Sequence, residues 1–229
     1  MSRMPKSTIR PQRGEAEPRV RRGYFECRFG QLHVHNAMPP GGGFEEGTAL
    51  MCLHGAAGSG RMFRAFMPLL GRDRSVYAPD VPGCGESDGP EKPVATAEYA
   101  AALGDFLDTM RLRSVDLLAH GAGALLAIEL ALARPAQLRR LVLVSVPAGT
   151  AAPSAVDFGA ATYPWRERLA RVAQPLLVLR PRDGSWDAAA RVRDVLPAAR
   201  VVDLPDQGAD LLQSAPGVVA EAVGPFLRG

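Results

Sequence analysis

The chain has 229 residues, of which 47% are hydrophobic and 22% are charged. This length and composition suit one soluble domain that buries most of its apolar surface. No apolar run approaches the length that crosses a bilayer, so we expect no membrane contact.

Charge is distributed unevenly along the chain. The first 22 residues hold seven of the 27 basic residues and two of the 24 acidic ones, which leaves 20 basic and 22 acidic residues in the rest. We therefore expect a solvated, partly disordered basic arm over residues 1–22, followed by one domain over 23–229. The near-neutral body offers no face for nucleic acid.

The three cysteines, Cys27, Cys52 and Cys84, have no paired spacing. They predict neither a disulfide framework nor a zinc motif, and they fit a reducing, cytoplasmic compartment. We expect no metal and no cofactor. His33 and His35, in an apolar segment near the N-terminus, are expected to be packing or surface residues.

The predicted elements alternate from residue 22 onward. Strands at 22–29 and 31–38 are joined at Gly30 and Gln31, which indicates a hairpin. A turn-rich loop follows. The first half of the chain then predicts a strand at 48–54, a helix at 61–71, a strand at 75–80, a helix at 95–110 and a strand at 114–120.

The second half continues the alternation. It predicts a helix at 122–134, a strand at 138–147, an irregular segment at 148–173 with one helix near 165–173, a strand at 174–181, a helix at 185–196, a strand at 199–205 and a closing helix at 215–227. This order predicts an α/β fold with a mostly parallel sheet, an antiparallel N-terminal hairpin and helices on both faces. Ligand sites in such sheets lie beyond the carboxyl ends of the strands.

Five of the turns after these strands carry motifs. In chain order they read LHGAAGSG (53–60), APDVPGCGESD (78–88), LLAHGAGALLA (117–127), PLLVLRPRDGSW (175–186) and VVDLPDQGAD (201–210). Together, in this order, they resemble the α/β-hydrolase superfamily, in the branch of the proline iminopeptidases and haloalkane dehalogenases. The resemblance covers residue 23 to the C-terminus and implies the α/β-hydrolase fold.

The same resemblance locates the catalytic positions. In the family, a serine at a sharp strand-to-helix turn attacks a carbonyl, a histidine takes its proton and an acid orients the histidine. The corresponding positions here are Gly121, Gly184 and Ala209, with Asp183 one residue before the acid position. No histidine follows His120 in the chain. All three triad positions are therefore expected to be vacant.

The parts that would bind a substrate oxygen are still present. The resemblance implies two backbone N–H donors, one from Ala122 and one from Ala56 or Ala57. These donors either stabilise an oxyanion or are only the backbone geometry of the turn, and the sequence leaves both readings open. We expect a pocket over Gly121 that binds a small, mostly apolar molecule carrying a carbonyl or carboxylate oxygen.

Three further side chains are candidates for this site. His120 and Asp183 are the candidates for proton transfer, and Cys84 is a candidate for ligand contact. His54 is expected to be structural. Segment 148–173 is a shortened lid compared with the family, so the site is expected to be open or to be completed by another subunit of a homo-oligomer.

Three functions fit this sequence. The first is a non-hydrolytic protein that binds a small molecule or a partner. The second is a non-hydrolytic enzyme, such as a lyase, isomerase or cyclase, that uses the backbone donors. The third is a hydrolase with an unconventional nucleophile such as Cys84.

Overall fold

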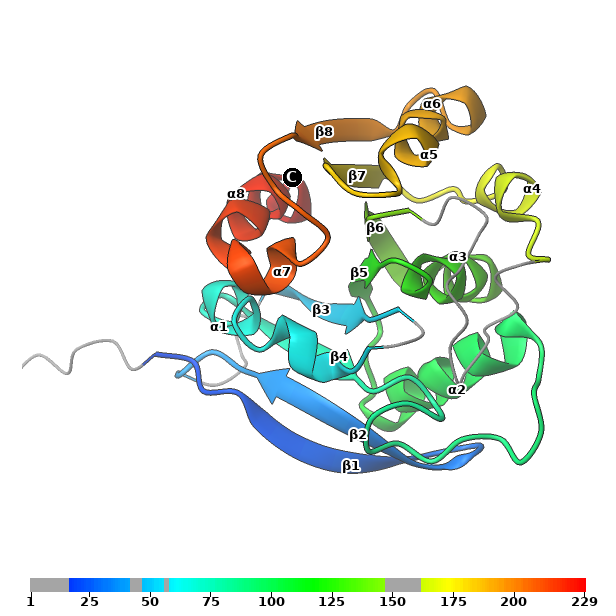
Figure 1. The fold of residues 1–229 in the computed structure, drawn as a ribbon. Helices are drawn as coiled ribbons and strands as arrows, with labels where there is room; N and C mark the ends of the chain where they lie inside the picture. The colour runs from blue at the N-terminus through cyan, green and yellow to red at the C-terminus, as the bar shows by residue number, and fades with distance from the viewer. Residues whose placement is uncertain (1–16, 42–46, 56–57, 147–161) are drawn as a thin grey trace, which may run out of the picture.

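The computed structural model describes residues 17–41, 47–55, 58–146 and 162–229 (Figure 1). The strands in these residues are β1 (Arg21–Cys27), β2 (Gly30–Ala37), β3 (Gly47–Leu53), β4 (Arg74–Pro79), β5 (Val115–His120), β6 (Leu138–Val144), β7 (Leu176–Pro181) and β8 (Arg200–Leu204). The helices are η1 (Gly60–Phe63), α1 (Met67–Leu70), α2 (Thr96–Thr109), α3 (Gly123–Ala133), α4 (Trp165–Leu169), α5 (Trp186–Ala190), α6 (Val192–Val195), α7 (Leu211–Ser214) and α8 (Pro216–Arg228).

The strands form one sheet in the order β1-β2-β4-β3-β5-β6-β7-β8. β2 is antiparallel to both β1 and β4, and every other pair is parallel. The predicted fold class is therefore confirmed. Because the parallel strands run in one direction, the turns after β3, β4, β5, β6 and β7 meet at the same edge of the sheet.

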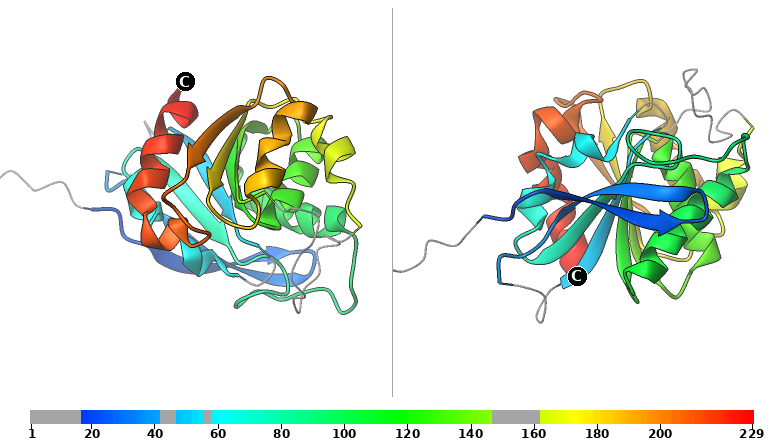
Figure 2. Two further views of the ribbon diagram at one scale, coloured as in Figure 1. Left: turned by 45° about the horizontal axis from the view of Figure 1, so that its top comes forward. Right: turned by 90° about the horizontal axis from the view of Figure 1, so that it is seen from below.

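Helices cover both faces of the sheet, and each face has its own core. Successive strand residues point to opposite faces: Leu117 packs in the core under α2 and α3, whereas Leu118 packs in the core under α1, α7 and α8. Figure 2 (right) shows α8 on one side of the sheet and α2 and α3 on the other. The near-continuous apolar strands in the sequence reflect this burial on both faces. No helix in the described ranges has the length and apolarity that a bilayer crossing requires.

The structure corrects the helix predicted at 61–71. It has instead the 3₁₀ turn η1 and the short α1, with Pro68 in the first turn of α1. Pro68 has no N–H to donate to a carbonyl four residues earlier, so a continuous helix through this position would lose a hydrogen bond. The helix predicted at 185–196 is likewise divided into α5 and α6 at Arg191.

Three smaller corrections concern boundaries. The hairpin turns at Arg28 and Phe29 rather than at Gly30 and Gln31, because Gly30, at φ +110°, already pairs with Cys27. β1 begins at Arg21, so the last two residues of the predicted arm belong to the sheet. The predicted helix at 165–173 ends at Leu169, and α7 was not predicted. Residues 1–16 of the arm lie outside the described residues.

Candidate functional site

The turn between β5 and α3 has the geometry of a tight elbow. Gly121 has φ +55°, its N–H donates to Val144 O at 2.9 Å, and its carbonyl accepts from Ala124 N at 3.0 Å. A Cβ added at Gly121 would meet no atom of the described residues within 4 Å, whereas one at Gly123 would lie 2.7 Å from Leu53 O. Among the described residues the apex therefore has open space above it, and the residue that begins α3 does not.

His120 joins this elbow to the loop after β8. Its Nε2 lies 3.1 Å from the carbonyl oxygen of Ala209. A carbonyl only accepts hydrogen bonds, so Nε2 carries the proton and Nδ1 of the neutral ring keeps its lone pair. Burial is the main cause that lowers the pKa of His120 below its ordinary value, although the bond to Ala209 opposes it. The contact also means that the position predicted for the base lies beside the elbow.

Asp183, after β7, is held by two serines. Its Oδ2 accepts from Ser145 Oγ at 2.5 Å, and its Oδ1 accepts from the backbone N–H and Oγ of Ser185 at 2.8 Å and 2.6 Å. In the described residues this carboxylate therefore accepts hydrogen bonds from Ser145, at the end of β6, and from Ser185, and none from an imidazole. The neighbouring triad position, Gly184, is exposed, and a Cβ there would meet no atom within 4 Å.

Ser145 is a site residue that sequence reasoning missed. It directly follows β6, is 7% exposed and has φ +54°, a left-handed conformation that non-glycine residues rarely adopt. The only sequence signal was a polar residue at the end of an apolar strand. Its hydrogen bond to Asp183 ties the ends of β6 and β7 together at the edge where the elbow also lies.

His54 and Cys84 have structural environments. His54 is fully buried, with Nδ1 donating to Gly55 O at 2.7 Å and Nε2 accepting from Val81 N at 2.8 Å. This confirms the structural role expected of it. Cys84 is buried in the core, and burial raises the pKa of its thiol to about 11. A thiol with this pKa is protonated at neutral pH.

Part of the predicted lid (148–173) and part of the predicted oxyanion site lie outside the described residues. These are Ala56 and Ala57, Phe158 and the rest of 147–161. After this segment, Tyr163 Oη donates to Glu129 Oε1 at 2.7 Å, and Arg168 Nε donates to the same oxygen at 2.7 Å. Tyr163 and α4 therefore bind the predicted lid segment to α3.

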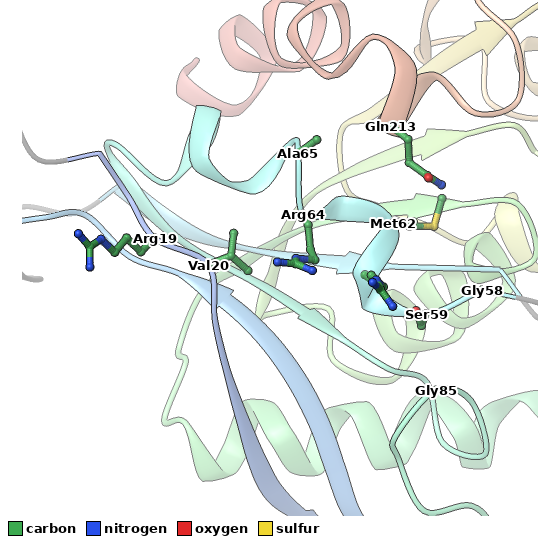
Figure 3. A pocket seen from close by; sticks show the side chains of 10 residues that line it. Arg19, Val20, Gly58, Ser59, Met62, Arg64, Ala65, Gly85 and Gln213 are labelled. Carbon is green, nitrogen blue, oxygen red and sulfur yellow. The ribbon is translucent and has the colours of Figure 1, made fainter.

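Two pockets lie beside η1, and Figure 3 shows residues that line the first of them. They have volumes of about 1100 Å³ and 470 Å³, and they share Ser59 and Arg64 among their lining residues. The larger one begins at Gly58, beside the loop after β3, and extends to Arg19 and Gln213. Neither pocket is lined by the elbow, so the pocket predicted over Gly121 stays a prediction.

Two histidines with lowered pKa values, the buried His54 and the half-buried His120, predict a pH dependence of stability. Burial is the largest cause that lowers the pKa values of His54 and His120. The unfolded chain then takes up protons below about pH 6.5, where the folded chain still resists them. We expect the free energy of unfolding to be greatest above about pH 6.5 and to fall below it by up to about 1.4 kcal/mol per pH unit for each such histidine.

Urea unfolding measured at about pH 7.5 and about pH 5.5 checks this expectation. The His120→Gln variant removes one of the titrating groups and should show a shallower decline than the parent chain. An unfolding free energy that stays constant between these two pH values would contradict the burial of neutral imidazoles.

Comparisons with known proteins agree with this geometry. A family model described as alpha/beta hydrolase fold matches residues 48–182. An uncharacterised protein of Mycobacterium tuberculosis is 29% identical over 133 residues, which are 58% of this chain and 39% of that protein. A 2-hydroxymuconate semialdehyde hydrolase of a Pseudomonas species is 36% identical over 108 residues, covering 43% of this chain and 36% of the hydrolase. The chain thus matches less than half the length of these curated relatives.

A solved structure extends the agreement to nearly the whole chain. The naproxen esterase of Bacillus subtilis superimposes with a TM-score of 0.76 at 19% identity, covering 91% of this chain and 92% of the esterase. At this identity the likeness concerns the fold alone. The sheet order, the elbow after β5 and the family match lead to one conclusion: this chain belongs to the α/β-hydrolase fold family.

Proposed function

We propose that this chain binds a small, mostly apolar molecule carrying one carbonyl or carboxylate oxygen above Gly121, and that it does not carry out serine acyl transfer. The observation that carries the proposal is the open apex of the elbow. Gly121 has no side chain to react, and a Cβ there would contact none of the described residues within 4 Å. Space is therefore left where the family places its nucleophile.

Backbone donors and small side chains support this proposal. Ala122 precedes the first residue of α3, and the first N–H groups of a helix have no partner within it. On the far side of the elbow, Ala209 presents only a methyl group and a carbonyl that His120 already occupies. A ligand oxygen beside these N–H groups would meet hydrogen-bond donors and no nucleophilic side chain from Gly121 or Ala209.

The first test is for hydrolysis. We expect the chain to turn over p-nitrophenyl acetate and butyrate no faster than the matched Gly121→Leu variant, because Gly121 has no nucleophilic side chain and Ala209 supplies no imidazole. Removing the nucleophile or base of a working triad costs roughly a millionfold in turnover. Turnover by the parent chain that Cys84→Ala abolishes would instead favour a hydrolase with a thiol nucleophile.

The second test is for binding. Isothermal titration with hexanoate should show saturable binding to the parent chain that Gly121→Leu abolishes, because leucine fills the space over the apex. Circular dichroism controls for folding of the variant. Equal binding of hexanoate to both proteins would mean that the ligand binds away from the elbow, and it would contradict the proposal.

Proton transfer is a second candidate activity, favoured by one contact. The bond from His120 Nε2 to Ala209 leaves the Nδ1 lone pair as a neutral base beside the apex. Such a base suits a lyase, isomerase or cyclase that removes a proton next to a carbonyl. Incorporation of solvent deuterium into 2-heptanone, catalysed by the parent chain and lost in His120→Gln, would favour this class over simple binding.

A thiol hydrolase has less support. Burial first, and the nearby carboxylate of Asp80 second, raise the pKa of Cys84 to about 11. A reactive thiolate needs the opposite environment, in which a nearby base or cation lowers the pKa of the thiol.

Completion of the lid by a second copy of the chain remains a prediction. Size-exclusion chromatography with light scattering tests it by measuring the mass of the protein in solution.

A further inference from the structure

Two histidines share one face of β2, away from the elbow. His33 and His35 are two residues apart on a strand, so their side chains point the same way. Their ring centroids lie 4.8 Å apart, and the residues are only 1% and 5% exposed. Asp80, 2% exposed and directly after β4, completes a cluster in which one nitrogen or oxygen atom from each residue lies within 4.8 Å of those of the other two. The expectation that these histidines are plain packing or surface residues does not explain this arrangement.

Each of these two imidazoles has a buried nitrogen without a partner. His33 Nε2 and His35 Nδ1 are inaccessible, and no described residue forms a hydrogen bond with them. His54 provides a contrast in the same molecule, because both of its ring nitrogens are hydrogen-bonded. Buried polar atoms are nearly always satisfied, so two orphans in one cluster indicate a water molecule or an ion that binds there.

Asp80 fixes which nitrogen of His33 has the lone pair. Its Oδ2 accepts from His33 Nδ1 at 2.9 Å and from Glu86 N at 2.9 Å, while Oδ1 accepts from Gly60 N at 2.6 Å. With Nδ1 donating to the carboxylate, Nε2 of the neutral ring is the bare acceptor. A carboxylate that holds the far nitrogen is the usual environment of a metal-binding histidine.

Geometry, burial and hydrogen bonding thus leave two rings, each with a nitrogen that no described residue hydrogen-bonds, on one face of a strand.

The cluster borders one of the described pockets. His35 and Asp80 line the 470 Å³ pocket, together with Glu86. Arg22, Arg61 and Arg64 line it as well, and their charges oppose a bound cation. A metal ion here therefore has to gain its affinity from the imidazole nitrogens, and the three guanidinium groups favour an anion or water as its remaining ligands.

We propose that His33 and His35 bind one divalent transition-metal ion of the Zn²⁺ class through Nε2 and Nδ1, with Asp80 as the residue that orients His33. Water or a small anion from the pocket supplies the remaining ligands. With two imidazole ligands from the protein, the site is open and binds more weakly than a closed four-ligand structural zinc site. The proposal does not depend on the function proposed for the elbow.

The test uses the untagged full chain after treatment with a chelator. Titration with ZnCl₂ should show one bound ion per chain and a rise in the thermal midpoint. His35→Gln and His33→Gln should each abolish this binding, whereas His120→Gln, which alters a histidine outside the cluster, should bind as the parent chain does. Failure of the parent chain to bind Zn²⁺, or unchanged binding by both cluster variants, would overturn the proposal.

A measurement on the parent chain guards against variants that fail to fold. The chain has four histidines, so their imidazole nitrogen resonances can be followed individually by NMR during addition of Zn²⁺. The proposal requires that His33 Nε2 and His35 Nδ1 shift while both nitrogens of His54 stay unchanged. Shifts confined to other histidines contradict it, and so does an absence of any shift, which would leave an ordered water molecule as the partner of the two nitrogens.

Discussion

The double variant Gly121→Ser, Ala209→His is expected to hydrolyse p-nitrophenyl acetate at least about 100-fold faster than either single variant, because a positioned general base contributes about 10²- to 10⁴-fold. The apex already has the left-handed backbone of the elbow and free space for a side chain. Residue 209 lies beside it, since its carbonyl accepts from His120. That contact uses the backbone and therefore survives the substitution.

The matched control is Gly121→Ser, Ala209→Gln, which fills the same position without a base. We expect this control and Gly121→Ser alone to stay at the background rate, because an unactivated serine is a poor nucleophile. Burst kinetics with the same substrate would reveal an acyl-enzyme in the double variant. A folded double variant that is no faster than its glutamine control would contradict the placement of residue 209 beside the apex.

Gly123→Ala should destabilise the fold by about 3 kcal/mol, the upper end of the usual cost of overpacking. The new Cβ would lie 2.6 Å from His54 O and 2.7 Å from Leu53 O, and both are backbone atoms at the end of β3 that no rotamer change can move. The first turn of α3 must then move away from the sheet. For a chain of this size we expect the thermal midpoint to fall by roughly 6–12 °C.

Gly184→Ala is the matched control, since the same added methyl group meets no atom within 4 Å. Its thermal midpoint, measured by differential scanning calorimetry, should stay close to that of the parent chain. Equal midpoints for Gly123→Ala and Gly184→Ala would mean that α3 does not pack as tightly on β3 as these distances require.

Much of the fold could be predicted from the sequence, because local patterns of apolar residues determine where the strands and helices lie. The apolar run around Leu117 and Leu118 is typical of a strand buried on both faces, and its burial on two sides bears this out. The prediction of one helix at 61–71 was wrong because it followed the spacing of the apolar residues and gave too little weight to Pro68. This residue has no N–H to donate within a longer helix, and the segment forms two short helices instead. Periodicity therefore located the elements, while single-residue backbone chemistry decided where they end.

The candidate site was less predictable, because its contacts join distant turns. The pairing of Ser145 with Asp183 spans 38 residues, and that of His120 with Ala209 spans 89. No local pattern in the sequence encodes such pairs. The spacing of His33 and His35 was readable, but the burial that leaves their nitrogens unpartnered depends on β1 and β4 packing beside them.

The anchoring of the segment between β6 and α4 has a consequence for engineering. On one side, Ser145 is tied to Asp183; on the other, Tyr163 and Arg168 are tied to Glu129 of α3. Both ends of an inserted loop would thus start from fixed points on the body. Each doubling of the length between them adds only about 0.6 kcal/mol of closure entropy. This scaffold is accordingly suited to receive grafted caps of different sizes, with which the range of ligands admitted to one elbow can be varied while the sheet beneath stays the same.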